Sequence, residues 1–227
     1  MKRTIRQAVL AMGGAAALMG APAQAGTPDG TWQVKALLTG VLADGAISKS
    51  GGPAVGVLAG SNAKANDNVV PTVALEYFFS PNISLETICC MTAHTVTGTG
   101  ALDGVDLVTD IHVIPATLAL KAHADLGAIK PYVGAGPAVM LFVDKKVSAP
   151  VAALGIDSVD IAPRLGAMVQ AGVDIPLGAT GLGFSVDVKR YFVRPVARFK
   201  DAAGAEQLWT RHKLDPLLLS AGLSYRF

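Results

Sequence analysis

Eight charged side chains stand in extended segments of this 227-residue chain, at positions that alternate with apolar residues. Four are acidic and four are basic: Glu76, Glu86, Asp174 and Asp187, and Lys35, Lys121, Lys189 and Arg226. Because successive side chains of a strand point to opposite faces, the alternation places these charges on the face away from an apolar surface. A charge in a low-dielectric interior needs a partner. We therefore expect a network of internal ion pairs that is chiefly structural, with a direct part in ion conduction as the alternative.

The histidine and cysteine positions do not predict a catalytic site. Hydrolysis would need a nucleophile, a base and an orienting group within hydrogen-bond reach of one another. Three histidines, His94, His112 and His212, are expected at the outer connections. The fourth, His123, is expected at the opposite rim, so the four cannot meet at one site. Cys89 and Cys90 lack histidine partners, which favours free or packed thiols over a metal site. We expect no catalytic residue, no metal and no cofactor.

The last residues of the chain indicate the kind of element that positions the charges. In the segment 214–227, one side of an extended strand would carry Leu217, Leu219, Ala221, Leu223, Tyr225 and Phe227. An apolar face of this length that ends in aromatic residues is typical of a transmembrane β-strand, which needs about 9–11 residues to cross the bilayer. In the cytosol, such an exposed strand would be an aggregation hazard.

Residues 1–25 have the pattern of an export signal. A basic start and an apolar run precede the small-x-small sequence Ala23-Gln24-Ala25, so the mature chain should begin near Gly26 and form one domain over 26–227. Removal of the three basic residues of the leader leaves 16 Lys and Arg against 17 Asp and Glu, which gives no support to nucleic-acid binding. The chain is 51% apolar. Because no run of about 18 apolar residues follows the leader, a barrel is favoured over spanning helices.

Alternating segments and the lengths of their connections predict the fold. Eight segments alternate, near 31–42, 69–79, 82–92, 111–123, 130–143, 164–177, 181–193 and 213–227. Connections of two to six residues alternate with long ones, 43–68, 93–110, 144–163 and 194–212, which are rich in Gly, Ala, Ser, Asn and Asp and are expected to be solvent-facing loops. The pattern predicts an all-β fold, an eight-stranded antiparallel up-and-down transmembrane β-barrel with both termini at the periplasmic rim. A soluble β-sandwich is the alternative.

The same alternation also turns apolar side chains inward. They are Leu37, Phe78, Ile88, Met168 and Leu218. An eight-stranded barrel has room inside for side chains or for one small ligand. We therefore expect these five residues to line a narrow passage for small hydrophobic molecules; the alternative is that they simply plug the barrel.

Four blocks of the sequence, in order across the mature chain, resemble the OmpW family of outer-membrane proteins. They are VPTVALEYFFSPN (70–82), HVIPATL (112–118), KPYVGAG (130–136), and Asp215-Pro216 followed by GLSYRF (222–227). Cys89-Cys90 and Leu217 depart from the family, which usually has small residues and Trp at those positions. Neither departure disturbs the alternation.

The resemblance implies an outer-membrane barrel of a Gram-negative bacterium with a narrow, largely hydrophobic passage that admits small hydrophobic compounds. Its expected partners are outer-membrane lipids, small hydrophobic solutes and the barrel assembly machinery, which would read the terminal Phe227 as an assembly signal. A closed structural barrel, or a surface receptor for bacteriocins or phages that acts through the long loops, remains the alternative.

Overall fold

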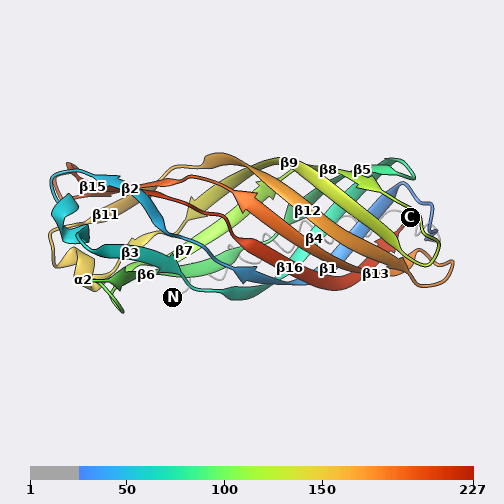
Figure 1. Ribbon diagram of the computed structural model, residues 1–227, viewed down its shortest axis with the longest axis horizontal. Helices are drawn as coiled ribbons and strands as arrows, with labels where there is room; N and C mark the ends of the chain where they lie inside the picture. The colour runs from blue at the N-terminus through green and yellow to red at the C-terminus, as the bar shows by residue number, and fades with distance from the viewer. Residues whose placement is uncertain (1–25) are drawn as a thin grey trace, which may run out of the picture.

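The computed structural model describes residues 26–227, so the predicted leader, residues 1–25, lies outside the described residues. Figure 1 shows an elongated barrel of tilted strands, with the C-terminus at one end and two short helical turns at the other. These turns are η2 (Val55–Leu58) and α2 (Ala149–Ala152). Within residues 26–227, no helix has the length and apolarity needed to cross a membrane.

Eight antiparallel strands close into a ring, which confirms the predicted fold class. In ring order they are β1 (Trp32–Leu42), β4 (Asn68–Ser80), β5 (Ile83–Cys89), β8 (Ala119–His123), β9 (Lys130–Val143), β12 (Arg164–Pro176), β13 (Leu182–Phe192) and β16 (Leu217–Arg226). The ring closes where β16 pairs with β1, with Arg226 opposite Gln33. Strand pairing around the ring satisfies backbone polar groups that would otherwise be exposed to lipid.

The predicted alternation is present along β16 and its neighbours. Leu219 is 48% exposed on the outer face, whereas Leu218 and Ser220 beside it are 4% and 5% exposed. The ten residues of β16, at about 3.3 Å each and a tilt of about 40°, rise about 25 Å along the barrel axis. That height matches the apolar band of an outer-membrane barrel, so the outward face of β16 spans the band from end to end.

Tight turns and both ends of the described chain lie at one end of the barrel, which we call the short-turn end. β4 passes into β5, and β12 into β13, through short turns, and Gly178 and Gly181 adopt the positive φ angles of 75° and 76° that a tight reversal requires. Trp32 and Phe227 exchange two backbone hydrogen bonds of 2.9 and 2.8 Å there.

The expectation of solvent-facing loops in the long connections is wrong, because strands continue the barrel wall beyond the ring. We call these strands the extension; they are β2 (Ile47–Gly51), β3 (Ser61–Ala65), β6 (Thr92–Gly100), β10 (Lys146–Val147), β11 (Ser158–Ile161), β14 (Val196–Lys200) and β15 (Glu206–His212). β11, β14, β15 and β2 form one sheet, while β3, β6 and β10 join the outer part of β7 (Asp106–Thr117). Inward apolar residues such as Phe199 hold these segments in strands despite their loop-like composition.

One predicted strand, 111–123, is interrupted. β7 ends at Thr117 and β8 starts at Ala119, and Pro115 within β7 has no N–H to donate. The carbonyl of Leu118 approaches Gly136 so closely that a Cβ on that glycine would lie 1.9 Å from the oxygen. Only glycine therefore fits at position 136 without a shift of the backbone.

Candidate functional site

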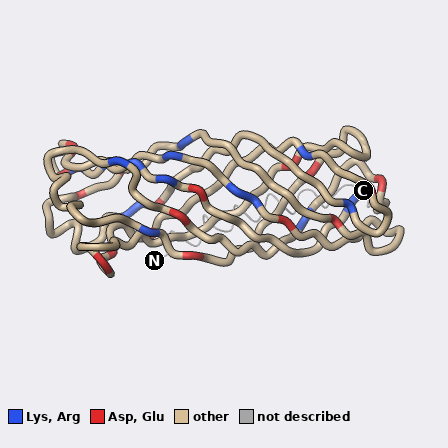
Figure 2. Tube along the Cα trace, in the orientation of Figure 1, with Lys and Arg blue, Asp and Glu red and all other residues tan. Residues whose placement is uncertain are grey.

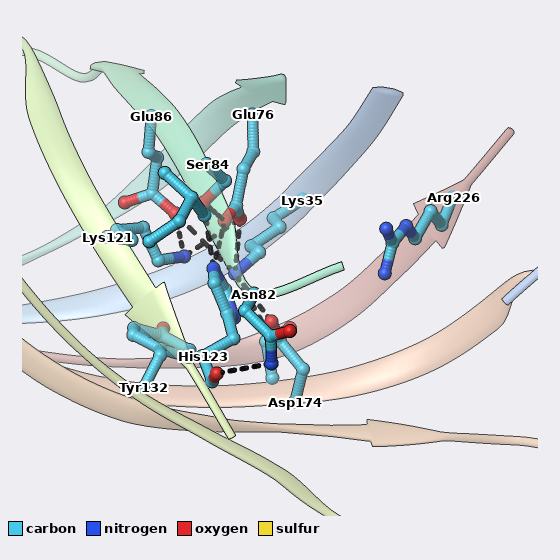
Figure 3. A network of polar contacts seen from close by, with 12 residues as sticks. Lys35, Glu76, Asn82, Ser84, Glu86, Lys121, His123, Tyr132, Asp174 and Arg226 are labelled. Carbon is cyan, nitrogen blue, oxygen red and sulfur yellow. Dashed lines mark hydrogen bonds and ion pairs between the residues drawn. The ribbon is translucent and has the colours of Figure 1, made fainter. Parts of the chain in front are cut away.

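Seven charged side chains meet inside the barrel; we call them the charge layer, and five of them are labelled in Figure 3. They are Lys35, Lys121, Lys189, Glu76, Glu86, Asp174 and Asp187, and each is at most 7% exposed. The ammonium of Lys121 donates to Glu76 Oε2 at 2.8 Å and to Glu86 Oε2 at 2.9 Å. Lys35 Nζ lies 3.1 Å from Glu76 Oε2, so these four groups form one continuous cluster.

The remaining members extend the cluster across the barrel interior. Lys35 Nζ donates to Asp174 Oδ1 at 3.0 Å, and that oxygen also accepts a hydrogen bond from the Ser185 hydroxyl. Lys189 Nζ lies 2.8 Å from Asp187 Oδ2 and 3.2 Å from Glu86 Oε1. Each carboxylate contacts at least one ammonium group, as buried charges require.

Two residues of this cluster escaped the sequence reasoning. The ammonium of Lys121 lies 3.6 Å from the centre of the Tyr132 ring, a cation–π contact. His123 Nε2 lies 3.0 Å from Glu76 Oε1. This contact places the His123 side chain inside the barrel, whereas the sequence predicted it at the rim. The signal for His123 was present, since it stands two residues after the inward Lys121 on the same strand. Tyr132 was hidden because glycines and Pro137 blur the alternation of its strand.

Arg226 does not join the charge layer, and Figure 3 shows it apart from the cluster. Its Nε donates to the carbonyl of Gly30 at 2.6 Å, and its guanidinium lies 3.6 Å from the centre of the Phe78 ring. Together with His123, these two side chains line a cavity of about 30 Å³ at the short-turn end. The charge layer and this packed end leave little free space on the axial route through the barrel.

An apolar cavity of about 300 Å³, which we call the chamber, opens on the other side of the charge layer. Its walls come from both halves of the extension, and its floor includes Val41, Cys90, Met140, Tyr191 and Leu218. The chamber has room for small molecules, since an apolar cavity of about 150 Å³ already binds benzene. Most of its lining residues lie in the connections that the sequence pattern assigned to loops.

The five apolar residues predicted to line a passage occupy three different places. Leu218 lines the chamber, and Phe78 lines the small cavity at the short-turn end. Ile88 and Met168 pack with Leu218 in a core cluster, and Leu37 is 5% exposed inside the barrel. These residues therefore do not form one continuous lining. Leu37, Ile88 and Met168 pack inside the barrel, between the chamber and the charge layer.

Two histidines border the chamber in similar settings. His94 Nε2 lies 2.5 Å from the Thr92 hydroxyl and Nδ1 lies 2.8 Å from the Asn66 carbonyl. His212 Nε2 lies 2.8 Å from the Thr210 hydroxyl and Nδ1 lies 2.8 Å from the Gly45 carbonyl. Burial lowers the pKa of both imidazoles, which lie in the extension, beyond the membrane-spanning strands. The neutral form therefore suits the apolar chamber.

The barrel wall beside the chamber lacks backbone pairing over a short stretch, which we call the gap. Glu86 pairs with Ala119 on one side of it and Thr92 pairs with Val113 on the other. Within the described residues, no ladder joins the intervening segments, 87–91 and 114–118. Unpaired backbone at membrane depth is tolerated only where it borders protein or a cavity. Cys90 and Pro115 meet this condition, since both line the chamber.

Of the other residues singled out from the sequence, Cys90 belongs to the chamber floor, and the rest lie apart from it and from the charge layer. Cys89 is exposed on the outer face and Cys90 is buried, and both are free. His112 Nδ1 lies 3.7 Å from Asp144 Oδ2 near the extension. Phe227 packs against Tyr225 with ring centres 5.9 Å apart at the short-turn end, and its role as an assembly signal stays a prediction.

Comparisons with known proteins agree with this architecture. An uncharacterized outer-membrane protein of Sinorhizobium fredii, y4mB, is 33% identical over 97% of this chain and 93% of its own length. The crystal structure of the outer membrane protein OprG from Pseudomonas aeruginosa has the same fold at 23% identity, with a TM-score of 0.78 over 89% of this chain and 98% of that chain. The solid-state NMR structure of AlkL in lipid bilayers matches at 27% identity, with a TM-score of 0.65 over 91% and 94%. The model of the OmpW family matches residues 28–227, and the chain therefore belongs to this family of outer-membrane proteins.

Proposed function

We propose that the chain takes small apolar molecules from the exterior into the chamber and releases them sideways, through the gap, into the membrane. The observation that carries the proposal is that the chamber is open and apolar above the charge layer, while the gap adjoins it. The long-connection end faces outward because an even number of strands places both termini on the periplasmic side. An entering molecule therefore meets the chamber first.

The charge layer argues against an axial route for apolar molecules. Such a molecule would have to pass Lys35, Glu76 and Lys121, which are all 0% exposed, with both lysines paired to Glu76. Separation of these ions would leave charges without partners in a low-dielectric interior, which is costly. The charge layer therefore acts as a floor, and it separates the chamber from the periplasm.

The gap supplies the alternative exit. On its outer face, Met91 is 55% exposed and Leu118 is 47% exposed, so both edges present apolar side chains to lipid. Pro115 cannot donate a ladder hydrogen bond to the facing strand. An apolar molecule that leaves the chamber between Cys90 and Pro115 exchanges one apolar environment for another. We propose no bond-making step in this passage and hence no enzymatic activity.

A disulfide across the gap tests this route. Continuation of the flanking register places Ala116 opposite Cys89, and both are exposed on the outer face. The variant Ala116→Cys with Cys90→Ser can therefore be cross-linked by oxidation. The matched control joins positions 85 and 120, which pair within an intact ladder, as Leu85→Cys with Leu120→Cys after both native cysteines are changed to Ser.

The measurement is uptake of naphthalene by outer-membrane vesicles from a host without its own family members. We expect oxidised Ala116→Cys vesicles to take up naphthalene at the background rate, reductant to restore uptake, and the control cross-link to have no effect. Uptake that persists with the gap cross-linked would refute the lateral exit. Uptake by the parent protein at the background rate would instead favour a closed structural barrel, which the packed charge layer also permits.

A further inference from the structure

Five basic side chains form a patch on the outer surface, where the ring passes into the extension. They are Lys49, Arg190, Arg194, Arg211 and Lys213. Their strands are neighbours, since β15 pairs with β2 and with β14, and the end of β13 bridges to the start of β16 through Val193 and Leu214. Figure 2 shows several Lys and Arg positions close together on neighbouring strands in the half away from the C-terminus.

A β-bulge places Lys49 in this patch. His212 pairs with Ile47 and Arg211 pairs with Lys49, so Ser48 is the extra residue. Ile47 and His212 line the chamber. Without the bulge, strict alternation would also turn Lys49 toward the chamber. The extra residue instead puts Lys49 directly beside Arg211 on the outer face.

Most of the patch has no acidic partner. Within residues 26–227, the side chains of Lys49, Arg190 and Arg211 form no ion pair, and Arg211 Nε is buried without a hydrogen-bond partner. Asp215 is the carboxylate paired with the other two, Arg194 and Lys213. Like charges directly opposite each other on neighbouring strands destabilise a sheet. An anion bound between the facing Arg211 and Lys49 would therefore remove a destabilising repulsion.

The patch begins at the upper edge of the lipid-facing band and extends outward from it, since Arg211 precedes the first residue of β16 by six positions. Arg190 pairs with Leu217, the first residue of β16, whose outward face spans the whole band. Lys213 precedes this edge and is exposed, so it lies at the level of lipid headgroups in the outer leaflet. A cationic side chain at that level can bury its stem against acyl chains and extend its charge to the headgroups.

We propose that this patch binds the phosphate groups of a phosphorylated glycolipid in the outer leaflet. A phosphate between Lys49 and Arg211 would accept charge-assisted hydrogen bonds from both and would cancel their repulsion. The Arg211 Nε that lacks a partner is a further donor for such a group. The opposite side of the extension offers no equivalent, since Lys146 there is paired with Asp110 at 2.9 Å.

Titration of the detergent-solubilised protein with diphosphorylated lipid A, followed by native mass spectrometry, tests this proposal. The variant is Lys49→Gln with Arg211→Gln, and the matched control is Lys145→Gln with Lys146→Gln, at β10 on the opposite side of the extension. Loss of two cations at a membrane surface is expected to weaken lipid A binding about 30-fold. The control should bind within about twofold of the parent protein, because surface charges away from the lipid contribute little.

Two further arms identify the source of the phosphate. Lipid A without phosphates should bind no better to the parent than to the variant, and millimolar inorganic phosphate should not displace lipid A. Equal affinities of parent and variant, or displacement by inorganic phosphate, would overturn the proposal. The double variant should fold at least as well as the parent in lipid-free detergent, since it removes a repulsion. If the double variant does not fold, the single variant Lys49→Gln replaces it, and the change in the logarithm of its lipid A affinity should be about half as large. None of these outcomes depends on passage through the gap.

Discussion

Replacement of Lys121 by Met removes the cation that joins two carboxylates at the centre of the charge layer. Its ammonium lies 2.8 Å from Glu76 Oε2 and 2.9 Å from Glu86 Oε2, and the side chain is 0% exposed. Removal of one partner of a buried ion pair costs about 3–5 kcal/mol, because a charge is left without compensation. Here Glu76 keeps Lys35 at 3.1 Å and Glu86 keeps Lys189 at 3.2 Å. We therefore expect a loss near the lower end, about 3 kcal/mol.

The free energy of unfolding can be measured by urea titration in lipid vesicles, with tryptophan fluorescence as the signal. The matched control is Lys146→Met, which breaks an exposed pair with Asp110 and should change stability little. The double variant Lys121→Met with Glu86→Gln should recover part of the loss, because it also removes a carboxylate that has lost one of its lysine partners. If Lys121→Met and the exposed control cost the same, the interior of the barrel is hydrated enough to screen its charges, and our account of the floor fails.

Two other predictions concern the outer face and the chamber. Leu219→Arg should destabilise the barrel by about 2–4 kcal/mol, whereas Ser220→Arg, which points inward, should be milder; equal costs in urea titrations would contradict the assignment of faces. Because burial lowers the pKa of His94 and His212, the unfolded chain takes up protons first as the pH falls. Their contribution to the free energy of unfolding is fully present above the pKa of the unfolded chain, about 6.5. It is lost as the pH falls from that value toward the lowered pKa of the folded state. Unfolding midpoints between about pH 7.5 and 5 should therefore decline in the parent and decline less in His94→Gln with His212→Gln; parallel declines would show that other groups are responsible.

The sequence predicted the ring of the barrel well because lipid imposes a strict two-residue alternation on its strands. A single outward charge on β16 would have broken the pattern, and there is none between Leu217 and Phe227. The inward position of the acidic and basic residues followed from the same alternation. Arg226 shows the limit of that reasoning, since alternation gives the face of a residue but not its partner, which is Gly30.

The extension and the chamber could not be predicted in the same way. Outside the bilayer, the outer face of a strand meets water, so segments such as β14 and β15 carry polar residues outside and fewer apolar residues inside. The bulge at Ser48 also shifts the alternation by one residue, which hides the face of Lys49. The gap depends on a break at Leu118, and a local pattern of apolar and polar residues does not reveal which backbone groups lack a partner.

The register on the two sides of the gap has a consequence for how fast the wall can move. From Glu86 to Thr92 and from Ala119 to Val113, the two strands advance by the same number of residues. Closing the gap therefore requires no sliding of one strand past the other, a movement that would turn every side chain to the wrong face. Only the local backbone near Pro115 and Leu118 has to rotate. Opening and closing should thus occur at the rate of loop motions, nanoseconds to microseconds, while the rest of the barrel stays in its folded state.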